Sequence, residues 1–151
     1  MVKDKENAYK YFDEALNLDG DNYKAYICYA ISKSDFGDFE GAAKLYEKAI
    51  ETEPKHINAY ILLGNLYSNL KQYSKAHEYY QKVLDINNMD ASVHVLIANT
   101  YYMMNDVQEA LKSYKFASSL EPDNDEYKLV YIQILEEYIQ EKRAGELIAN
   151  V

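Results

Sequence analysis

The feature that most constrains this chain is a sequence repeat of 34 residues. Residues 23–56, 57–90 and 91–124 align at that spacing with no insertion or deletion. Gapless copies of this length are typical of repeat architectures, in which each unit buries its apolar surface against its neighbours. The sequence therefore predicts a stack of similar units in place of one central core.

The residues that recur are those that let helices pack closely. The eighth position of each copy is small, the twentieth is alanine, the twenty-fourth is tyrosine, and the thirty-second is proline or asparagine. Alanine one helical turn before tyrosine gives a small-then-large surface on one helix face, and the last position ends a helix. In order, these residues are Ala30, Gly64 and Ala98; Ala42, Ala76 and Ala110; Tyr46, Tyr80 and Tyr114; Pro54, Asn88 and Pro122. Each copy is therefore expected to hold two helices.

This pattern resembles the tetratricopeptide repeat (TPR) family, and the central copy resembles it most. That copy reads Tyr60-x2-Leu63-Gly64-x2-Tyr67, then Ala76-x3-Tyr80, with Asn88 where the family has proline. The first copy departs at Lys33, where the family prefers tyrosine, and the third has His94 for the aromatic residue. The resemblance implies an all-α fold: a right-handed α-solenoid of antiparallel helix pairs (TPR superhelix) with about 3 full repeats plus partial repeats at both ends.

The same register extends to both ends, so we expect a single TPR domain over residues 1–151. Residues 5–22 match the second helix of a repeat that lacks its first helix. Truncation of a longer protein and a natural helical cap both explain that missing helix. Residues 125–150 continue as a terminal partial repeat or as one capping helix, since no turn-forming residue lies between Glu126 and Arg143.

Charge and composition narrow the classes of partner. The formal net charge is -9, and no cluster of Lys and Arg forms the basic stripe that nucleic-acid binders use to neutralise phosphates. No apolar run approaches the roughly 18 residues of a membrane span, and the N-terminus has no apolar signal-peptide core. We therefore expect no nucleic acid, no membrane insertion and a cytoplasmic location.

The residue types needed for catalysis are scattered. His56, His77 and His94 fall in different repeats, and Cys28 is the only cysteine, so neither paired imidazoles nor a thiolate cluster can form around a metal. The five glycines lie too far apart to cradle a phosphate. The sequence predicts no enzyme activity, no catalytic residue, no metal and no cofactor.

The resemblance to the family places a peptide-binding groove on the concave side, lined by the first helix of each pair. The predicted groove residues are Lys24, Ile27, Ile31, Asn58, Ile61, Asn65, Asn69, Ser92, Val95, Asn99, Tyr102 and Met103. Asn65 and Asn99 share one column, and an amide there can both donate to and accept from a peptide unit. The alternative is that asparagine is simply tolerated at an exposed position.

An apolar strip is expected beside the asparagines. It comprises Ile27, Ile31, Ile61, Val95, Tyr102 and Met103, and either buries apolar side chains of a partner or packs between the first helices. The acidic residues Glu126, Glu136 and Glu137 at the C-terminal end would favour Lys or Arg in a partner.

One ligand mode of the family is disfavoured. The two-carboxylate clamp that holds a chaperone tail requires basic residues at columns that hold Ile27, Ser92 and Leu96 here, and asparagines at columns that hold Ile31 and Leu62. The sequence therefore predicts a non-catalytic protein-protein interaction module, an adaptor or scaffold that captures a peptide or helix of another kind. The alternatives are a structural module that self-assembles as a homo-oligomer through its terminal helices, and a regulatory domain excised from a larger protein.

Overall fold

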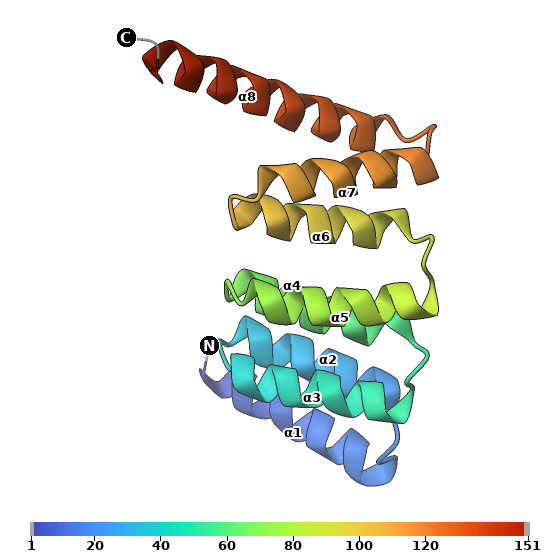
Figure 1. Ribbon diagram of the computed structural model, residues 1–151. Helices are drawn as coiled ribbons and strands as arrows, with labels where there is room; N and C mark the ends of the chain where they lie inside the picture. The colour runs from blue at the N-terminus through green and yellow to red at the C-terminus, as the bar shows by residue number, and fades with distance from the viewer. Residues whose placement is uncertain (1, 150–151) are drawn as a thin grey trace. The chain divides into compact units, whose positions relative to one another are not determined.

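A computed structural model describes the backbone of residues 2–149 and the side chains of residues 5–146. The described residues form helices joined by short loops, in agreement with the predicted all-α fold (Figure 1). The helices are α1 (Val2–Leu18), α2 (Tyr23–Asp35), α3 (Phe39–Thr52), α4 (Ile57–Asn69), α5 (Tyr73–Ile86), α6 (Ala91–Met103), α7 (Val107–Leu120) and α8 (Asp125–Ala149). No helix within residues 2–149 is both long and apolar enough to cross a bilayer.

The helix boundaries repeat with the sequence period. The first helices of the pairs begin at Tyr23, Ile57 and Ala91, and the second helices at Phe39, Tyr73 and Val107, so both series advance by 34 residues. At the C-terminal end α8 runs without a break to Ala149. Residue 150 of the terminal segment expected over residues 125–150 lies outside the described residues.

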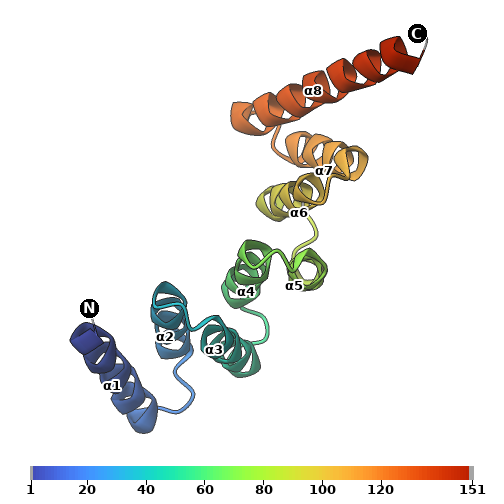
Figure 2. The same cartoon turned by 90° about the vertical axis from the view of Figure 1, so that its left-hand side faces the viewer.

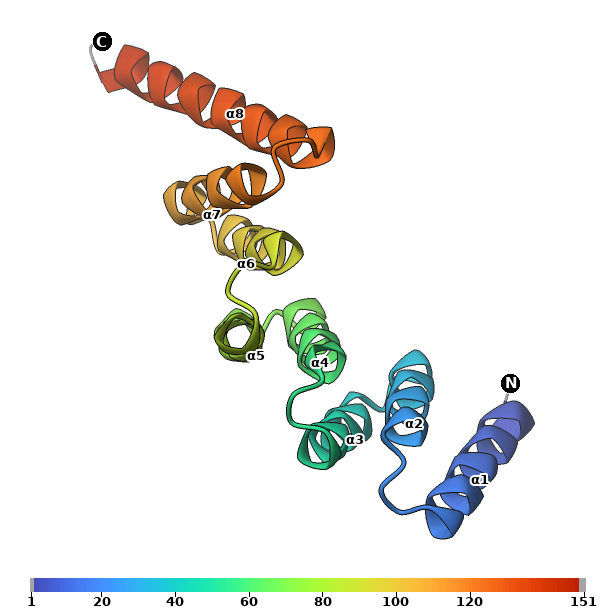
Figure 3. The ribbon, with the colours of Figure 1, turned by 90° about the vertical axis from the view of Figure 1, so that its right-hand side faces the viewer.

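The chain divides into two compact units, residues 1–86 and 87–151, and each is described by itself. In the first unit, α2 and α4 lie on one side while α3 and α5 lie on the other (Figures 2 and 3). In the second unit, α6 packs against α7, which packs against α8. The assignment of residues 1–151 to one domain stays a prediction.

A left-handed backbone residue reverses the chain within each helix pair. Gly37, Lys71 and Asn105 occupy equivalent positions after the first helix, with φ of 80°, 58° and 63°. The residue that follows each of them donates its N–H back to the helix, as in the bond from Gln72 to the Tyr67 carbonyl at 2.8 Å. This is a helix C-cap that glycine and asparagine adopt easily and that lysine adopts at a cost.

The predicted packing columns form the core. The alanines of the twentieth position are fully buried, and the tyrosines of the twenty-fourth position are 1–4% exposed. At the fourth position, the side chains bond to the backbone of the preceding loop: Tyr26 donates to the Gly20 carbonyl at 2.8 Å, and Tyr60 to the Pro54 carbonyl at 3.0 Å. In the second unit the His94 Nε2 lies 3.4 Å from the Asn88 carbonyl. The tyrosine-rich composition and His94 are thus explained by helix packing and loop contacts.

The terminal helices bury less of the same columns. Ala8, Phe12 and Ala15 of α1 are half-buried, whereas their equivalents in α3, Ala42, Tyr46 and Ala49, are buried. In α8, Ile132 occupies the eighth position, where the full repeats have alanine or glycine, and it is 48% exposed. A bulky residue at that position prevents a second helix from approaching α8 as closely as the helices of a full repeat approach each other.

Candidate functional site

The first unit has a pocket between α2 and α4, with one side chain of α3 beneath it. Its volume is about 290 Å³, and it is open to solvent on one side. The lining residues are Ile31, Ser34 and Asp35 from α2, Tyr46 from α3, and Leu62, Asn65, Leu66 and Asn69 from α4. Ile31, Asn65 and Asn69 are among the groove residues predicted from the sequence. The pocket therefore combines apolar walls with polar groups, as ligand sites commonly do.

Two predicted groove residues already have a partner within their own repeat. The Asn65 amide oxygen accepts a hydrogen bond from the Tyr80 hydroxyl at 2.7 Å, and the Asn99 oxygen accepts one from Tyr114. Each bond joins the first helix of a pair to the second. The amide NH2 group then remains to donate to a ligand carbonyl, so each asparagine offers a donor more readily than an acceptor. The sequence showed the column of asparagines but not this bond, whose signal is the constant separation of asparagine and tyrosine by 15 residues.

The apolar strip expected beside the asparagines is interrupted. Ile27 is 7% exposed and belongs to the core of the first unit, as in the alternative in which strip residues pack between helices. In that core its apolar surface is removed from water without a partner protein. Ile61 is half-buried, whereas Ile31 is 40% exposed. Lys24, Asn58 and Asn69, which the resemblance to the family placed in the groove, are exposed.

The second unit presents its own part of the predicted surface on α6. Ser92 and Asn99 are exposed, Val95 is half-buried, and Tyr102 and Met103 are 40% and 62% exposed. Tyr102 lies beside Glu137 and Glu141 of α8.

Tyr102 is tied to that acidic helix. Its hydroxyl donates to the Glu137 carboxylate at 3.0 Å, and this bond, together with the negative charge of Glu137, raises the pKa of Tyr102. Glu137 also accepts a hydrogen bond from the Gln133 amide at 3.2 Å. Tyr102, Glu137 and Glu141 line a depression of about 180 Å³, so this part of the surface is suited to a cationic side chain.

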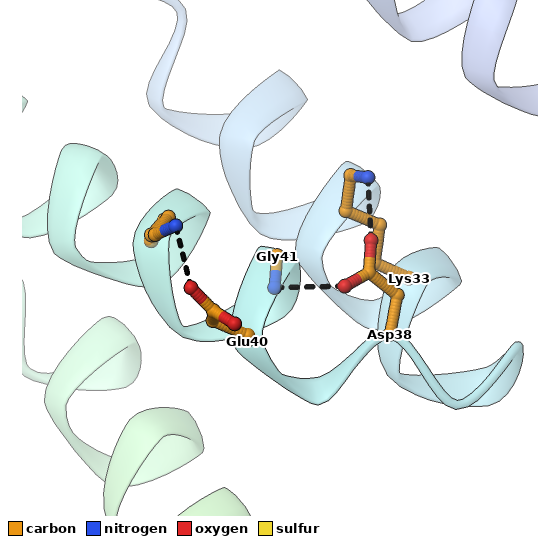
Figure 4. A network of polar contacts seen from close by, with 5 residues as sticks. Lys33, Asp38, Glu40 and Gly41 are labelled. Atoms are coloured by element: carbon orange, nitrogen blue, oxygen red, sulfur yellow. Dashed lines mark hydrogen bonds and ion pairs between the residues drawn. The ribbon is translucent and has the colours of Figure 1, made fainter.

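Lys33, where the sequence departs from the family pattern, joins three parts of the first unit. Its ammonium group lies 2.8 Å from the Asp38 carboxylate and 4.5 Å from the centroid of the Tyr9 ring on α1. Asp38 also accepts the Gly41 N–H at 2.9 Å and so caps α3 (Figure 4). The bond from Lys33 and the N–H of Gly41 lower the pKa of Asp38. The lysine thus stabilises a helix cap and the packing of α1, and its role is structural.

No group of three or more His, Cys, Asp and Glu side chains gathers into a metal site within the described part of the chain. The free Cys28 is exposed on α2.

Comparison with known proteins gives one match to a family and several to folds. Residues 35–100 match the family model described as tetratricopeptide repeat. No curated protein matches the chain significantly in sequence.

Among solved structures, residues 41 to the end of MamA from Desulfovibrio magneticus RS-1 have a TM-score of 0.73 at 20% identity, covering 97% of this chain and 82% of that chain. A second MamA crystal structure has a TM-score of 0.69 at 19% identity, covering 95% and 93%. The first TPR of Spaghetti (RPAP3), bound to the HSP90 peptide SRMEEVD, has a TM-score of 0.66 at 17% identity, covering 78% and 93%.

At these identities the solved structures show the shared fold, and the matched repeat sequence agrees with it. The predicted all-α solenoid fold class is confirmed, and the match over residues 35–100 supports the resemblance to the tetratricopeptide repeat family.

Proposed function

We propose that this chain is a non-catalytic adaptor that captures a peptide or helix of a partner protein on the surface formed by the first helices of its repeats. A TPR fold supports a protein-protein interaction module, and the RPAP3 domain shows that a fold of this kind binds a peptide. The observation that carries the proposal is the pocket between α2 and α4, which lies on predicted groove residues. A cytoplasmic location is part of the proposal.

The contacts expected on this surface are polar and apolar together. In the first unit the Asn65 NH2 group donates to a backbone carbonyl of the ligand, because its oxygen is occupied by Tyr80. Ile31 and the half-buried Ile61 supply apolar contact. In the second unit, Asn99 repeats the role of Asn65, and the carboxylates near Tyr102 favour Lys or Arg in the partner.

The proposal is tested by variants that alter the surface but not the packing. Asn69 and Lys24 are exposed and lie on predicted groove columns, so Asn69→Asp and Lys24→Glu should weaken binding of peptides selected against the parent chain. Ser74→Asp, at an exposed position of α5, is the matched control. Asn65→Ala is a poorer test, because it also removes the bond from Tyr80.

Binding would be measured by isothermal titration calorimetry, with circular dichroism as the check on folding. Loss of binding with the α2 and α4 variants and retention with Ser74→Asp would support the groove. Equal binding by all variants would reject it. In that case, self-association of the variants, measured by sedimentation velocity, would favour the alternative function, which is assembly through α1 and α8.

A further inference from the structure

One tyrosine hydroxyl in the first unit lacks the partner that its counterparts have. Tyr46, Tyr80 and Tyr114 occupy the same repeat position, and all three are at least nine-tenths buried. Tyr80 and Tyr114 donate to the asparagine oxygens of Asn65 and Asn99. Within the described residues, Tyr46 has no such hydrogen bond, because its repeat carries Ile31 at the asparagine column. The Tyr46 hydroxyl, which lines a pocket open to solvent, is therefore free to donate to a group that enters from outside.

The Tyr46 side chain lies where a ligand can reach it. It is 4% exposed, and it lines the pocket between α2 and α4 together with Asp35 and Ile31. Burial, and after it the negative charge of Asp35, raises the pKa of Tyr46 to about 12, so the hydroxyl stays protonated and can donate near neutral pH. The pocket thus has a donor from Tyr46 and an acceptor from the exposed Asp35 carboxylate.

In the other two full repeats, the equivalent tyrosine hydroxyl donates a hydrogen bond to a carboxamide oxygen. We propose that the pocket between α2 and α4 binds a carboxamide side chain, Gln or Asn, of the partner peptide. The Tyr46 hydroxyl donates to the carboxamide oxygen, as Tyr80 donates to Asn65, and the Asp35 carboxylate accepts from its NH2 group. Leu62, Leu66 and Ile31 enclose the methylene groups. This inference rests on the proposed function and specifies one side chain of the ligand.

Other side chains satisfy the pocket less well. A carboxylate would be repelled by Asp35, and an aliphatic side chain would leave the hydroxyl unpaired. An ammonium group suits Asp35 but can only donate, so the Tyr46 proton would still lack an acceptor. Of the carboxylate, aliphatic, ammonium and carboxamide groups, only the carboxamide supplies both an acceptor and donors.

The test uses the full chain and four blocked peptides, Ac-Ala-X-Ala-NH2 with X as Gln, Glu, Lys or Leu, titrated by NMR. We expect the Gln peptide to bind about fivefold more tightly than the others, as one neutral hydrogen bond implies. Tyr46→Phe should remove that preference. Tyr114→Phe, which deletes a hydroxyl already bonded to Asn99, is the control and should retain it.

A second variant tests the inference through the fold. Ile31→Asn places in the first repeat the asparagine that the next two have, so it should raise the melting temperature and abolish the preference for Gln. Equal binding of all four peptides, a preference that survives Tyr46→Phe, or no binding of the Gln peptide would overturn the inference. Equal binding of the four peptides, with NMR chemical-shift changes at Lys24 and Asn69, would overturn the inference while leaving the proposed groove intact. Peptide-induced chemical-shift changes confined to other surfaces of the protein would count against the groove itself.

Discussion

Gly64 on α4 is the position at which close packing of a helix pair can be tested most directly. A Cβ atom built there would lie 2.4 Å from Cε1 and 2.8 Å from Cδ1 of the Tyr80 ring. Carbon atoms pack at about 3.5–4.0 Å, so the ring would have to move by roughly 1 Å. Tyr80 is 1% exposed and its hydroxyl is bonded to Asn65, so the ring has little room to move.

Two opposing terms set the effect of Gly64→Ala. Replacing glycine by alanine inside a helix stabilises it by about 1 kcal/mol. Forcing a methyl group into a close-packed contact costs about 1–3 kcal/mol, and the confined ring places Gly64→Ala toward the upper end of that range. We therefore expect a net loss of about 1–2 kcal/mol, or about 2–8 °C in melting temperature for a chain of this size.

The assay is thermal and urea unfolding followed by circular dichroism. Gly145→Ala is the matched control: it makes the same substitution within α8, where an added Cβ would meet no atom within 4 Å. It should not destabilise the protein and should increase helicity. If Gly64→Ala raises the melting temperature instead, the α4 and α5 pair can separate without cost, and the reasoning is refuted. Ala98 in the third repeat shows that a methyl group fits this column where the helices have packed around it.

Two further substitutions and one double-mutant cycle test separate features by the same unfolding measurements. Lys71→Gly should stabilise the protein by up to about 1 kcal/mol, because lysine there has φ of 58°; a loss would show that its side chain makes a contact of greater value. Tyr9→Phe should stabilise it by about 1 kcal/mol, since the Tyr9 hydroxyl is buried without a hydrogen-bond partner among the described residues; destabilisation would mean that the hydroxyl is satisfied. A double-mutant cycle of Lys33→Met and Asp38→Asn should give a coupling of about 1 kcal/mol near pH 7. Because the pKa of Asp38 is lowered in the folded state, that coupling is present above the unfolded pKa and is lost as pH falls through the folded pKa; a coupling that is unchanged in strong acid would contradict this.

Periodicity was the part of the sequence that determined most about this protein. The gapless 34-residue spacing predicted the helix pairs and the buried columns. When every unit is alike, the small and large residues at helical spacing meet the same neighbours in each repeat, so they pack in the same way. The same reasoning found the exposed polar positions of the first helices, such as Asn69.

Only the tertiary structure decided how individual side chains are used. Ile27 and Ile31 stand four residues apart on α2, yet one is 7% and the other 40% exposed, because Ile27 belongs to the hydrophobic core of the first unit whereas Ile31 lines the solvent-open pocket. Asn65 and Asn99 appear as free groove amides in the sequence, but their oxygens are bonded to tyrosines of the second helices. The missing bond at Tyr46 is visible only once that pattern is known. Sequence periodicity specifies which column a residue occupies, whereas hydrogen bonds and burial depend on atoms that another helix brings within a few ångströms.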